Sequence, residues 1–281
     1  MRSIEQRQSA SGSLRYSSKL MTALNRFTAG LSTEVANPLK AKYGKAYDHL
    51  ISADTHRYRE EIETAIEQYQ LALDCRNDFT EAYLGIAKCY RRKGDVQAAI
   101  SYLERALAQN AFRKELHLDI AKCFAETGCN AKSIHHYERV IKLDRRSVEA
   151  RFGLALVAET GHDLDYAMRL YQDIIEIENE FLPAYNNLGS LYMRVGRYTH
   201  AEELFRTLIA KAPEFSRGHL GLAITLDKSG KCQDALKAYQ SVLRMRPTTK
   251  NAEFIEKRII YLNKELGRVK TRNNTTLVLV K

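Results

Sequence analysis

Residues 182–215, LPAYNNLGSLYMRVGRYTHAEELFRTLIAKAPEF, decide how the rest of the chain is interpreted. They contain two runs of mostly apolar residues at the spacing of a half-buried helix. The runs are Tyr185, Leu188, Gly189 and Tyr192, followed by Ala201, Leu204, Phe205 and Leu208. Gly196, between the runs, suits the left-handed backbone at a helix end, and Pro213 cannot lie in a helix interior. We therefore expect two helices joined by a short turn.

Gly189 and Ala201 are the small members of these runs. Two helices that are joined by a short turn must approach each other closely, and a large side chain at either place would hold them apart. We therefore expect a large side chain at Gly189 to overpack the hairpin and to destabilise it.

The same order of residue types recurs on both sides of this segment. Five consecutive units share one register, at residues 80–113, 114–147, 148–181, 182–215 and 216–249. Small residues recur at one place in three of these units, as Gly85, Gly153 and Gly221. If the units are equivalent hairpins, these three glycines must occupy equivalent positions in space.

The pattern Tyr185-x2-Leu188-Gly189-x2-Tyr192, then Ala201-x3-Phe205 and Pro213, resembles the tetratricopeptide repeat. That repeat has a period of about 34 residues and a tryptophan where Tyr185 stands. The resemblance implies an all-α fold, a right-handed superhelical solenoid of helix-turn-helix units.

The N-terminal flank continues the pattern only in part. Residues 46–79 contain a clear second helix, but Leu50 and Ile51 fall off the expected apolar stripe of the first. We interpret these residues as a degenerate capping repeat, because one face of a terminal unit meets solvent or a flanking element.

The C-terminal flank holds one amphipathic helix without a partner helix. We expect it to span residues 250–267, to cap the last repeat and to end at Gly267. Residues 268–281 are then a flexible basic tail. The alternative for the β-prone run 275–280 is a strand that adds to the sheet edge of a partner.

Residues 1–45 form a basic segment that we expect to be disordered or partly helical. Within residues 14–31, several apolar residues could line one face of a helix, and no acidic residue occurs between Glu5 and Glu34. These apolar residues are Leu20, Met21, Leu24, Phe27 and Leu31. Three interpretations stay open: a locally packed or disordered segment, an organellar targeting peptide, and a helix that docks on a partner or on a membrane surface.

The net charge of +10 is concentrated at the two ends of the chain. Residues 1–45 carry eight Lys and Arg against two Asp and Glu, and residues 250–281 carry eight against three. The body between them, with 28 basic and 29 acidic residues, is nearly neutral. A nucleic-acid-binding solenoid should be basic along its body, so nucleic acid is an unlikely partner.

The sequence carries no signature of catalysis or of a cofactor. It lacks a nucleophile motif, a Walker loop and a dinucleotide fingerprint. His135 and His136 are adjacent, so on a helix they point about 100° apart and cannot bind one metal ion together. The five cysteines form no CxxC pair. We expect a protein that is not an enzyme and that needs no cofactor or metal.

Cysteine usage and hydropathy indicate the compartment. Cys89 and Cys123 fall on expected buried stripes, where a free thiol packs as a small apolar group, and scattered cysteines are typical of a reducing compartment. No run of 18 apolar residues occurs. We expect a cytoplasmic protein, with organellar targeting through the N-terminal segment left open.

The resemblance also implies where binding occurs. In tetratricopeptide repeats the first helices line the concave face of the superhelix, and the fifth, ninth, twelfth and thirteenth positions of each unit are exposed there. Together with the sixth position of one unit, the implied groove residues are Lys88, Arg91, Arg92, Lys122, Glu126, Phe152, Asn186, Asn187, Ser190 and Arg194. The lysine–asparagine clamp that some relatives use for a C-terminal carboxylate is missing.

These residues predict a groove that is basic toward the N-terminus and apolar in its middle, which suits an acidic-hydrophobic segment or an amphipathic helix. We interpret the chain as a non-enzymatic adaptor or scaffold that binds a segment of a partner protein there. The alternative is a self-associating assembly protein whose basic termini hold a membrane or another anionic surface, with residues 14–31 as the peripheral membrane contact.

Overall fold

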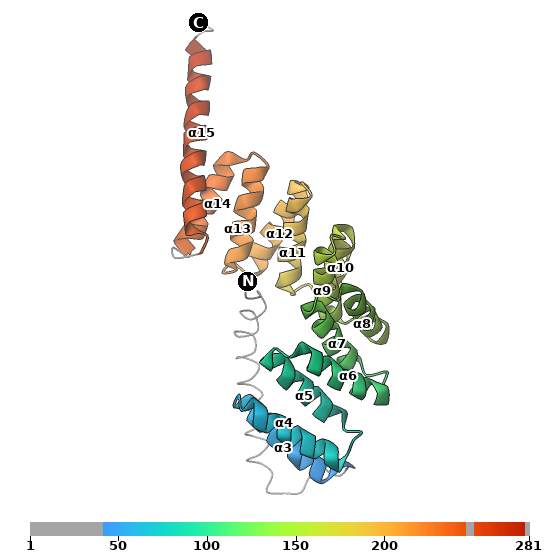
Figure 1. The fold of residues 1–281 in the computed structure, drawn as a ribbon. Helices are drawn as coiled ribbons and strands as arrows, with labels where there is room; N and C mark the ends of the chain where they lie inside the picture. Colours follow the sequence, from blue (N-terminus) through green and yellow to red (C-terminus); the bar gives the residue numbers. More distant parts are fainter. Residues whose placement is uncertain (1–41, 246–249, 279–281) are drawn as a thin grey trace. The chain divides into compact units, whose positions relative to one another are not determined.

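The computed structural model describes residues 42–245 and 250–278, and all regular structure within them is α-helical (Figure 1). The helices are α3 Lys45–Tyr58, α4 Ile62–Cys75, α5 Thr80–Lys93, α6 Val96–Gln109, α7 Lys114–Glu126, α8 Asn130–Leu143, α9 Val148–Thr160, α10 Leu164–Ile177, α11 Leu182–Arg194, α12 Tyr198–Lys211, α13 Ser216–Lys228, α14 Cys232–Met245 and α15 Ala252–Val278. The predicted all-α solenoid is confirmed. The predicted amphipathic segment 14–31 lies outside the described residues.

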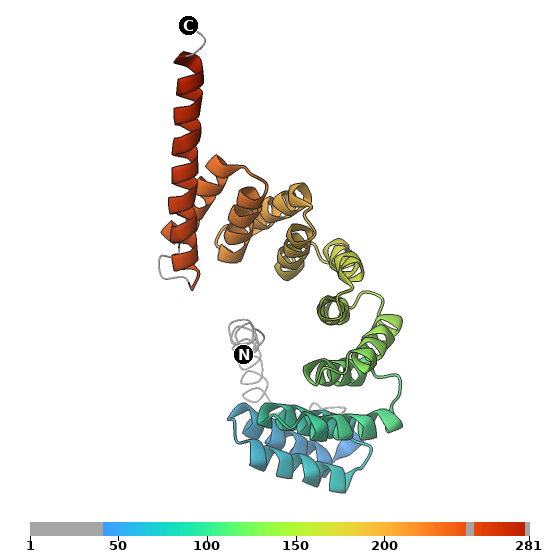
Figure 2. The ribbon, with the colours of Figure 1, turned by 45° about the horizontal axis from the view of Figure 1, so that its top comes forward.

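The chain divides into two compact units, one ending at Cys89 and the other beginning at Tyr90. The first unit holds α3, α4 and most of α5. In the second unit, each helix from α6 to α15 packs against the next one along the chain, and α7 also contacts α9, as α11 contacts α13. Figure 2 shows that, within this second unit, the first helices of the hairpins lie on the inner side of a curve and the second helices on its outer side.

One backbone feature marks the same place in six successive hairpins. One or two residues after the end of each first helix, a residue has a positive φ, which favours glycine because glycine has no Cβ to clash. These residues are Glu60 (φ 65°), Gly94 (85°), Gly128 (74°), His162 (64°), Gly196 (77°) and Gly230 (78°). The turn is therefore a property of the repeat, and the two hairpins with Glu60 and His162 adopt it without glycine.

The hairpin of α3 and α4 is more regular than the sequence predicts. The helix α3 has 14 residues, and its buried side chains are Ala46, Leu50 and Ala53. The prediction that Leu50 falls off the apolar stripe is wrong, because the buried line runs Ala46–Leu50–Ala53, at i, i+4 and i+7. Ile51 is 42 % exposed, as its position off the stripe predicts.

Each stacking glycine faces an aromatic ring from the second helix of the preceding hairpin. A Cβ on Gly85 would lie 2.2 Å from the ring of Tyr69, and one on Gly153 would lie 2.3 Å from Tyr137. The same contact recurs two repeats further on, where a Cβ on Gly221 would lie 2.4 Å from Phe205. The three glycines therefore occupy equivalent places, as expected if the units are equivalent hairpins.

The C-terminal helix corrects one prediction. We expected a stop at Gly267 and a non-helical tail, but α15 continues through Gly267 to Val278. A glycine ends a helix when its backbone turns left-handed, and Gly267 is not among the residues with positive φ. Within a helix, glycine only weakens the structure, by about 1 kcal/mol relative to alanine.

The buried cysteines are confirmed. Cys89 and Cys123 are buried, and all five cysteines are free thiols. Burial raises the pKa of the Cys123 thiol to about 12, so this side chain packs as a small apolar group.

Candidate functional site

The inner face of the second unit is formed by the first helices of its hairpins, and ion pairs join neighbouring first helices. Arg91 pairs with Glu126, which joins α5 to α7. Lys122 Nζ lies 2.5 Å from Oε1 of Glu149, which joins α7 to α9. Two of the four residues of the predicted basic groove, Arg91 and Lys122, are therefore neutralised by carboxylates of the same chain.

Arg91 illustrates the effect of such a pair. Burial lowers the pKa of its guanidinium, but the hydrogen bond and the charge of Glu126 outweigh burial and raise the pKa above its usual value. Arg91 stays charged and is held by its partner. A ligand that competes for it must break this pair.

The middle of the inner face is a hydrogen-bonded polar cluster. Asn187 Nδ2 donates to the hydroxyl of Tyr171 at 3.0 Å, and that hydroxyl donates to Glu159 at 2.6 Å. Arg194 completes the cluster with a bond of 3.3 Å to the same carboxylate. Asn186 donates to the side chain of Asn187 at 3.2 Å. These groups position α9, α10 and α11 relative to one another.

Four other predicted groove residues differ in their surroundings. Ser190 is engaged by its own helix, donating to the Asn186 carbonyl at 2.8 Å. The Phe152 ring packs at 5.2 Å from the ring of Phe181, so it belongs to the rim of the hydrophobic core. Arg92 is exposed. Lys88 is also exposed, and it lies in the first unit, so it is described apart from the others.

The inner face continues into α15, which the sequence predicts only as a cap. Phe254, Arg258 and Tyr261 stand one period after Leu220, Ile224 and Asp227 of α13. Phe254 is 47 % and Tyr261 50 % exposed. Carrying the repeat register past residue 249 would have found them.

The place of α15 is fixed by a charged cluster against α13. Arg258 donates two hydrogen bonds to Asp227, at 2.7 and 2.8 Å, and the hydroxyl of Tyr239 donates to the same carboxylate at 3.2 Å. Burial, together with the charge of Asp227, raises the pKa of Tyr239 well above its usual value, so its hydroxyl remains a donor. The Arg258 guanidinium also lies 4.6 Å from the centre of the Tyr261 ring.

On α13, two cations remain available to a partner. Arg217 and Lys228 are exposed, and within the described part of the chain neither makes an ion pair. Between them on the same helix lie Leu220 and Ile224, both half-buried. The order along the helix is thus basic, apolar, apolar, basic.

Over residues 42–245 and 250–278, no group of three or more His, Cys, Asp or Glu side chains is arranged to hold a metal ion. Over the same residues, no helix combines the length and the apolarity that a membrane crossing requires.

Solved structures with the same fold are similar to this chain at low sequence identity, which shows the fold alone. The type IV pilus biogenesis factor PilW is 14% identical, covers 75% of this chain and 98% of its own length, and has a TM-score of 0.65. A MamA protein is 24% identical, with 63% and 96% covered and a TM-score of 0.56. YrrB, a TPR protein with an unusual peptide-binding site, is 19% identical, with 66% and 96% covered and a TM-score of 0.52.

No curated protein sequence matches the chain significantly. The sequence profile of the tetratricopeptide repeat matches three stretches, residues 52–114, 118–180 and 186–250. Together these stretches cover more than half of the chain, and they coincide with the stacked hairpins of the structure. The chain therefore belongs to the tetratricopeptide repeat family.

Proposed function

We propose that this protein is a non-enzymatic interaction adaptor that binds an acidic segment with apolar residues, and that α13 and α15 form the docking end of its inner face. The observation that carries this proposal is the stripe on α13, defined by Arg217, Leu220, Ile224 and Lys228. It combines cations without a partner in the described residues with apolar side chains.

The geometry of the stripe sets the chemistry of the ligand. Arg217 and Lys228 are 11 positions apart on one helix, which places their backbones about 16 Å apart at 1.5 Å per residue. Leu220 and Ile224 lie between them on the same side of the helix. A segment with two acidic residues that flank apolar ones matches this order of charges.

The α15 helix supplies aromatic anchors beside the stripe. Phe254 and Tyr261 are large, half-exposed side chains, and aromatic residues contribute most to the affinity of many interfaces. The charge of Arg258 is already balanced by Asp227, so it positions α15. The predicted groove residues nearer the N-terminus, such as Arg91 and Lys122, are paired with Glu126 and Glu149, and in this proposal they brace the stack.

A peptide-display selection on the purified full chain tests the ligand class. The recovered sequences should be enriched in Asp or Glu on both sides of Leu, Ile or Phe. Basic or purely polar sequences would contradict the proposal.

A charge-reversal pair tests the location. The R217E/K228E variant should bind a selected peptide at least tenfold more weakly, as measured by fluorescence anisotropy, which corresponds to about 1.4 kcal/mol. The matched control K142E/K237E makes the same change of charge on the outer helices α8 and α14, where both lysines are exposed, and should bind normally. Equal binding by R217E/K228E and its control would move the site away from α13.

A further inference from the structure

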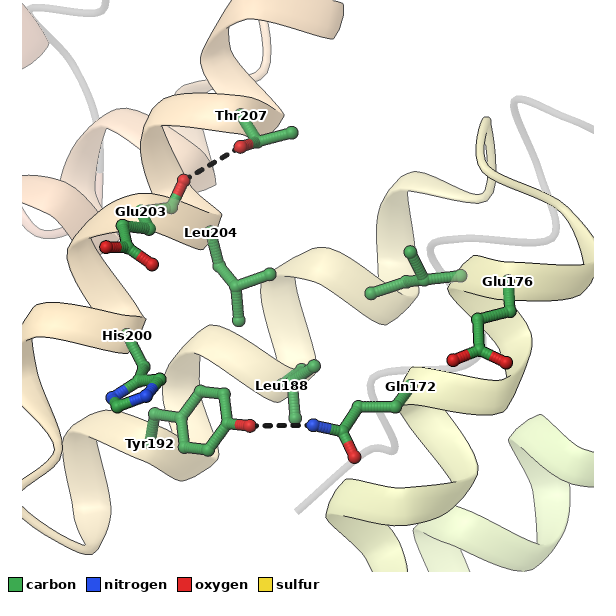
Figure 3. A pocket seen from close by; sticks show the side chains of 9 residues that line it. Gln172, Glu176, Leu188, Tyr192, His200, Glu203, Leu204 and Thr207 are labelled. Atoms are coloured by element: carbon green, nitrogen blue, oxygen red, sulfur yellow. Dashed lines mark hydrogen bonds between the residues drawn. The ribbon is translucent and has the colours of Figure 1, made fainter.

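A second surface lies on the outer side of the repeats. A pocket of about 370 Å³ opens between α10 and α12, with α11 at its floor (Figure 3). Ile175, Leu188 and Leu204 give it an apolar lining, one from each of the three helices. Gln172 Nε2 donates to the hydroxyl of Tyr192 at 2.8 Å, so the polar groups of the floor are already satisfied.

Two carboxylates stand on opposite sides of this pocket. Glu176 comes from α10 and Glu203 from α12, and both side chains are exposed. Neither carboxylate makes an ion pair or a hydrogen bond within the described residues; the Glu203 backbone carbonyl alone accepts a bond, from Thr207. The pocket thus offers an apolar floor below two negative charges. This arrangement suits a long cationic side chain, whose methylene groups bind to apolar surface while its charged end meets carboxylate.

This groove has a net negative charge that its two neighbours lack. The places of Glu176 and Glu203 are held one repeat earlier by Lys142 and Arg169, and one repeat later by Ala210 and Lys237. At the nine places equivalent to the pocket lining, the groove between α8 and α10 also holds Glu138 and Asp173, so its charges balance. The groove between α12 and α14 holds Arg206, Lys237 and Asp234 there. Of these three grooves only the one between α10 and α12 has a net negative charge at these places, so it is the one that favours a basic ligand.

We propose that this pocket, together with its two glutamates, binds the basic segment of residues 14–31 from the same protein. The segment carries Arg15, Lys19 and Arg26 and no acidic residue. Its apolar residues are spaced so that a helix would present them on one face, and such a face is stabilised by burial against an apolar surface. The pocket between α10 and α12 offers apolar side chains for this face and carboxylates for the three cations of the segment.

The assignment is independent of the docking site on α13, because the pocket lies between second helices, on the opposite side of the hairpins. It gives the acid-free N-terminal segment a defined binding site on the repeats. Of the interpretations of residues 14–31, the assignment favours docking on a protein surface. Membrane attachment is the competing interpretation, and the vesicle experiment below tests it.

Zero-length cross-linking of the full chain tests the proposal. A carbodiimide condenses a lysine amine with a carboxylate only when the two are in contact, and Lys19 is the single lysine of residues 14–31. Mass spectrometry of the digested protein should identify Lys19 joined to Glu176 or to Glu203. A mixture of ¹⁴N- and ¹⁵N-labelled protein then tells whether the segment binds its own chain or a second copy, and either result supports the assignment.

The R15E/R26E variant keeps Lys19 and both glutamates but reverses the other two cations of residues 14–31, so it should reduce this cross-link at least tenfold. Lysine at positions 176 and 203 suits the repeat, since Lys142 and Arg169 already hold the equivalent places, so the K19E/E176K/E203K variant should fold, and circular dichroism checks this. The control E104K/D234K reverses two exposed carboxylates on α6 and α14 and should keep the cross-link.

The K19E/E176K/E203K variant exchanges the charges of the two partners and should form a cross-link between the same positions. The proposal is overturned if the cross-link survives undiminished in R15E/R26E. It is also overturned if Lys19 joins neither glutamate in the wild-type chain, or if the charge exchange fails to restore the link in a folded variant. Sedimentation of the wild-type chain with anionic vesicles, together with an absent link, would assign the segment to a membrane surface instead.

Discussion

The packing of Phe205 between two glycines makes the substitution Gly221→Ala a direct test of how the hairpins stack. Phe205 is fully buried, and its ring lies against Gly189 of its own hairpin and Gly221 of the next one. A Cβ on Gly221 would stand 2.4 Å from Cε1 and 2.5 Å from Cζ of the ring. Carbon atoms in contact are normally about 3.5 to 4 Å apart, so the ring or the helix must move by about 1 Å.

The magnitude follows from two opposing effects. Overpacking of a well-packed core costs typically about 1 to 3 kcal/mol, and the ring has no free space toward Gly189, where a Cβ would stand only 2.9 Å away. Replacing glycine by alanine inside a helix contributes about 0.5 to 1 kcal/mol in the opposite direction. We expect a net loss of about 1 to 2 kcal/mol in the free energy of unfolding.

Urea denaturation followed by circular dichroism measures this loss, with Gly267→Ala as the matched control. Gly267 also lies inside a helix, but nothing stands within 4 Å of a Cβ placed there. The control should therefore be as stable as the wild type or slightly more stable. If Gly221→Ala unfolds at the same urea concentration as the wild type, Phe205 does not fill the contact between hairpins and the stacking argument fails.

Three further predictions concern the turns, the pH dependence and the last helix. His162→Gly should raise the free energy of unfolding by about 1 kcal/mol, because His162 holds the positive φ that glycine adopts without strain; an unchanged denaturation midpoint would argue against strain. Burial lowers the pKa of His136 from 6.5 to about 4. Between pH 6.5 and pH 4 this histidine is therefore protonated in the unfolded chain but neutral in the folded chain. The free energy of unfolding should fall over this range, by at most about 1.4 kcal/mol per pH unit. Melting curves of His136→Phe should lack this part of the pH dependence, and an identical pH profile would contradict it. Asp227→Asn removes the carboxylate that pairs with Arg258, so amide hydrogen exchange in α15 should accelerate. The control Glu253→Gln changes an exposed ion pair within α15 and should have little effect. Equal exchange rates in the two variants would refute the role of Asp227.

Much of the architecture is readable from the sequence because repeats are local structures. The spacing of Tyr185, Leu188 and Tyr192 on the first helix, and of Ala201 and Phe205 on the second, predicts an α-hairpin without knowledge of the rest of the chain. Recurrence of this pattern predicts the stack, since a single hairpin cannot bury its apolar face alone. Even the aromatic and glycine contacts between hairpins follow from the period once the register is known.

Residue type alone does not predict where a helix ends when the residue is compatible with both a helix and a turn. Gly267 looks like a helix end in sequence, yet α15 continues through it, because glycine permits a left-handed turn without requiring one. Conversely, Glu60 and His162 end helices with a positive φ that no sequence signal announces. At these two places the repeat imposes the turn on residues that do not favour it.

The sequence by itself determined the all-α repeat, its period and the positions that face inward, because each depends on spacing along one helix or on recurrence of one pattern. Only the tertiary structure decided which inward-facing cations are available to a partner. Arg91 and Lys122 look available in sequence, but they are paired with Glu126 and Glu149 on the first helix of the next hairpin, whereas Arg217 is not paired within the described residues. Such pairs depend on how far one hairpin is shifted and rotated against its neighbour, and that geometry arises from side chains packing across the whole stack.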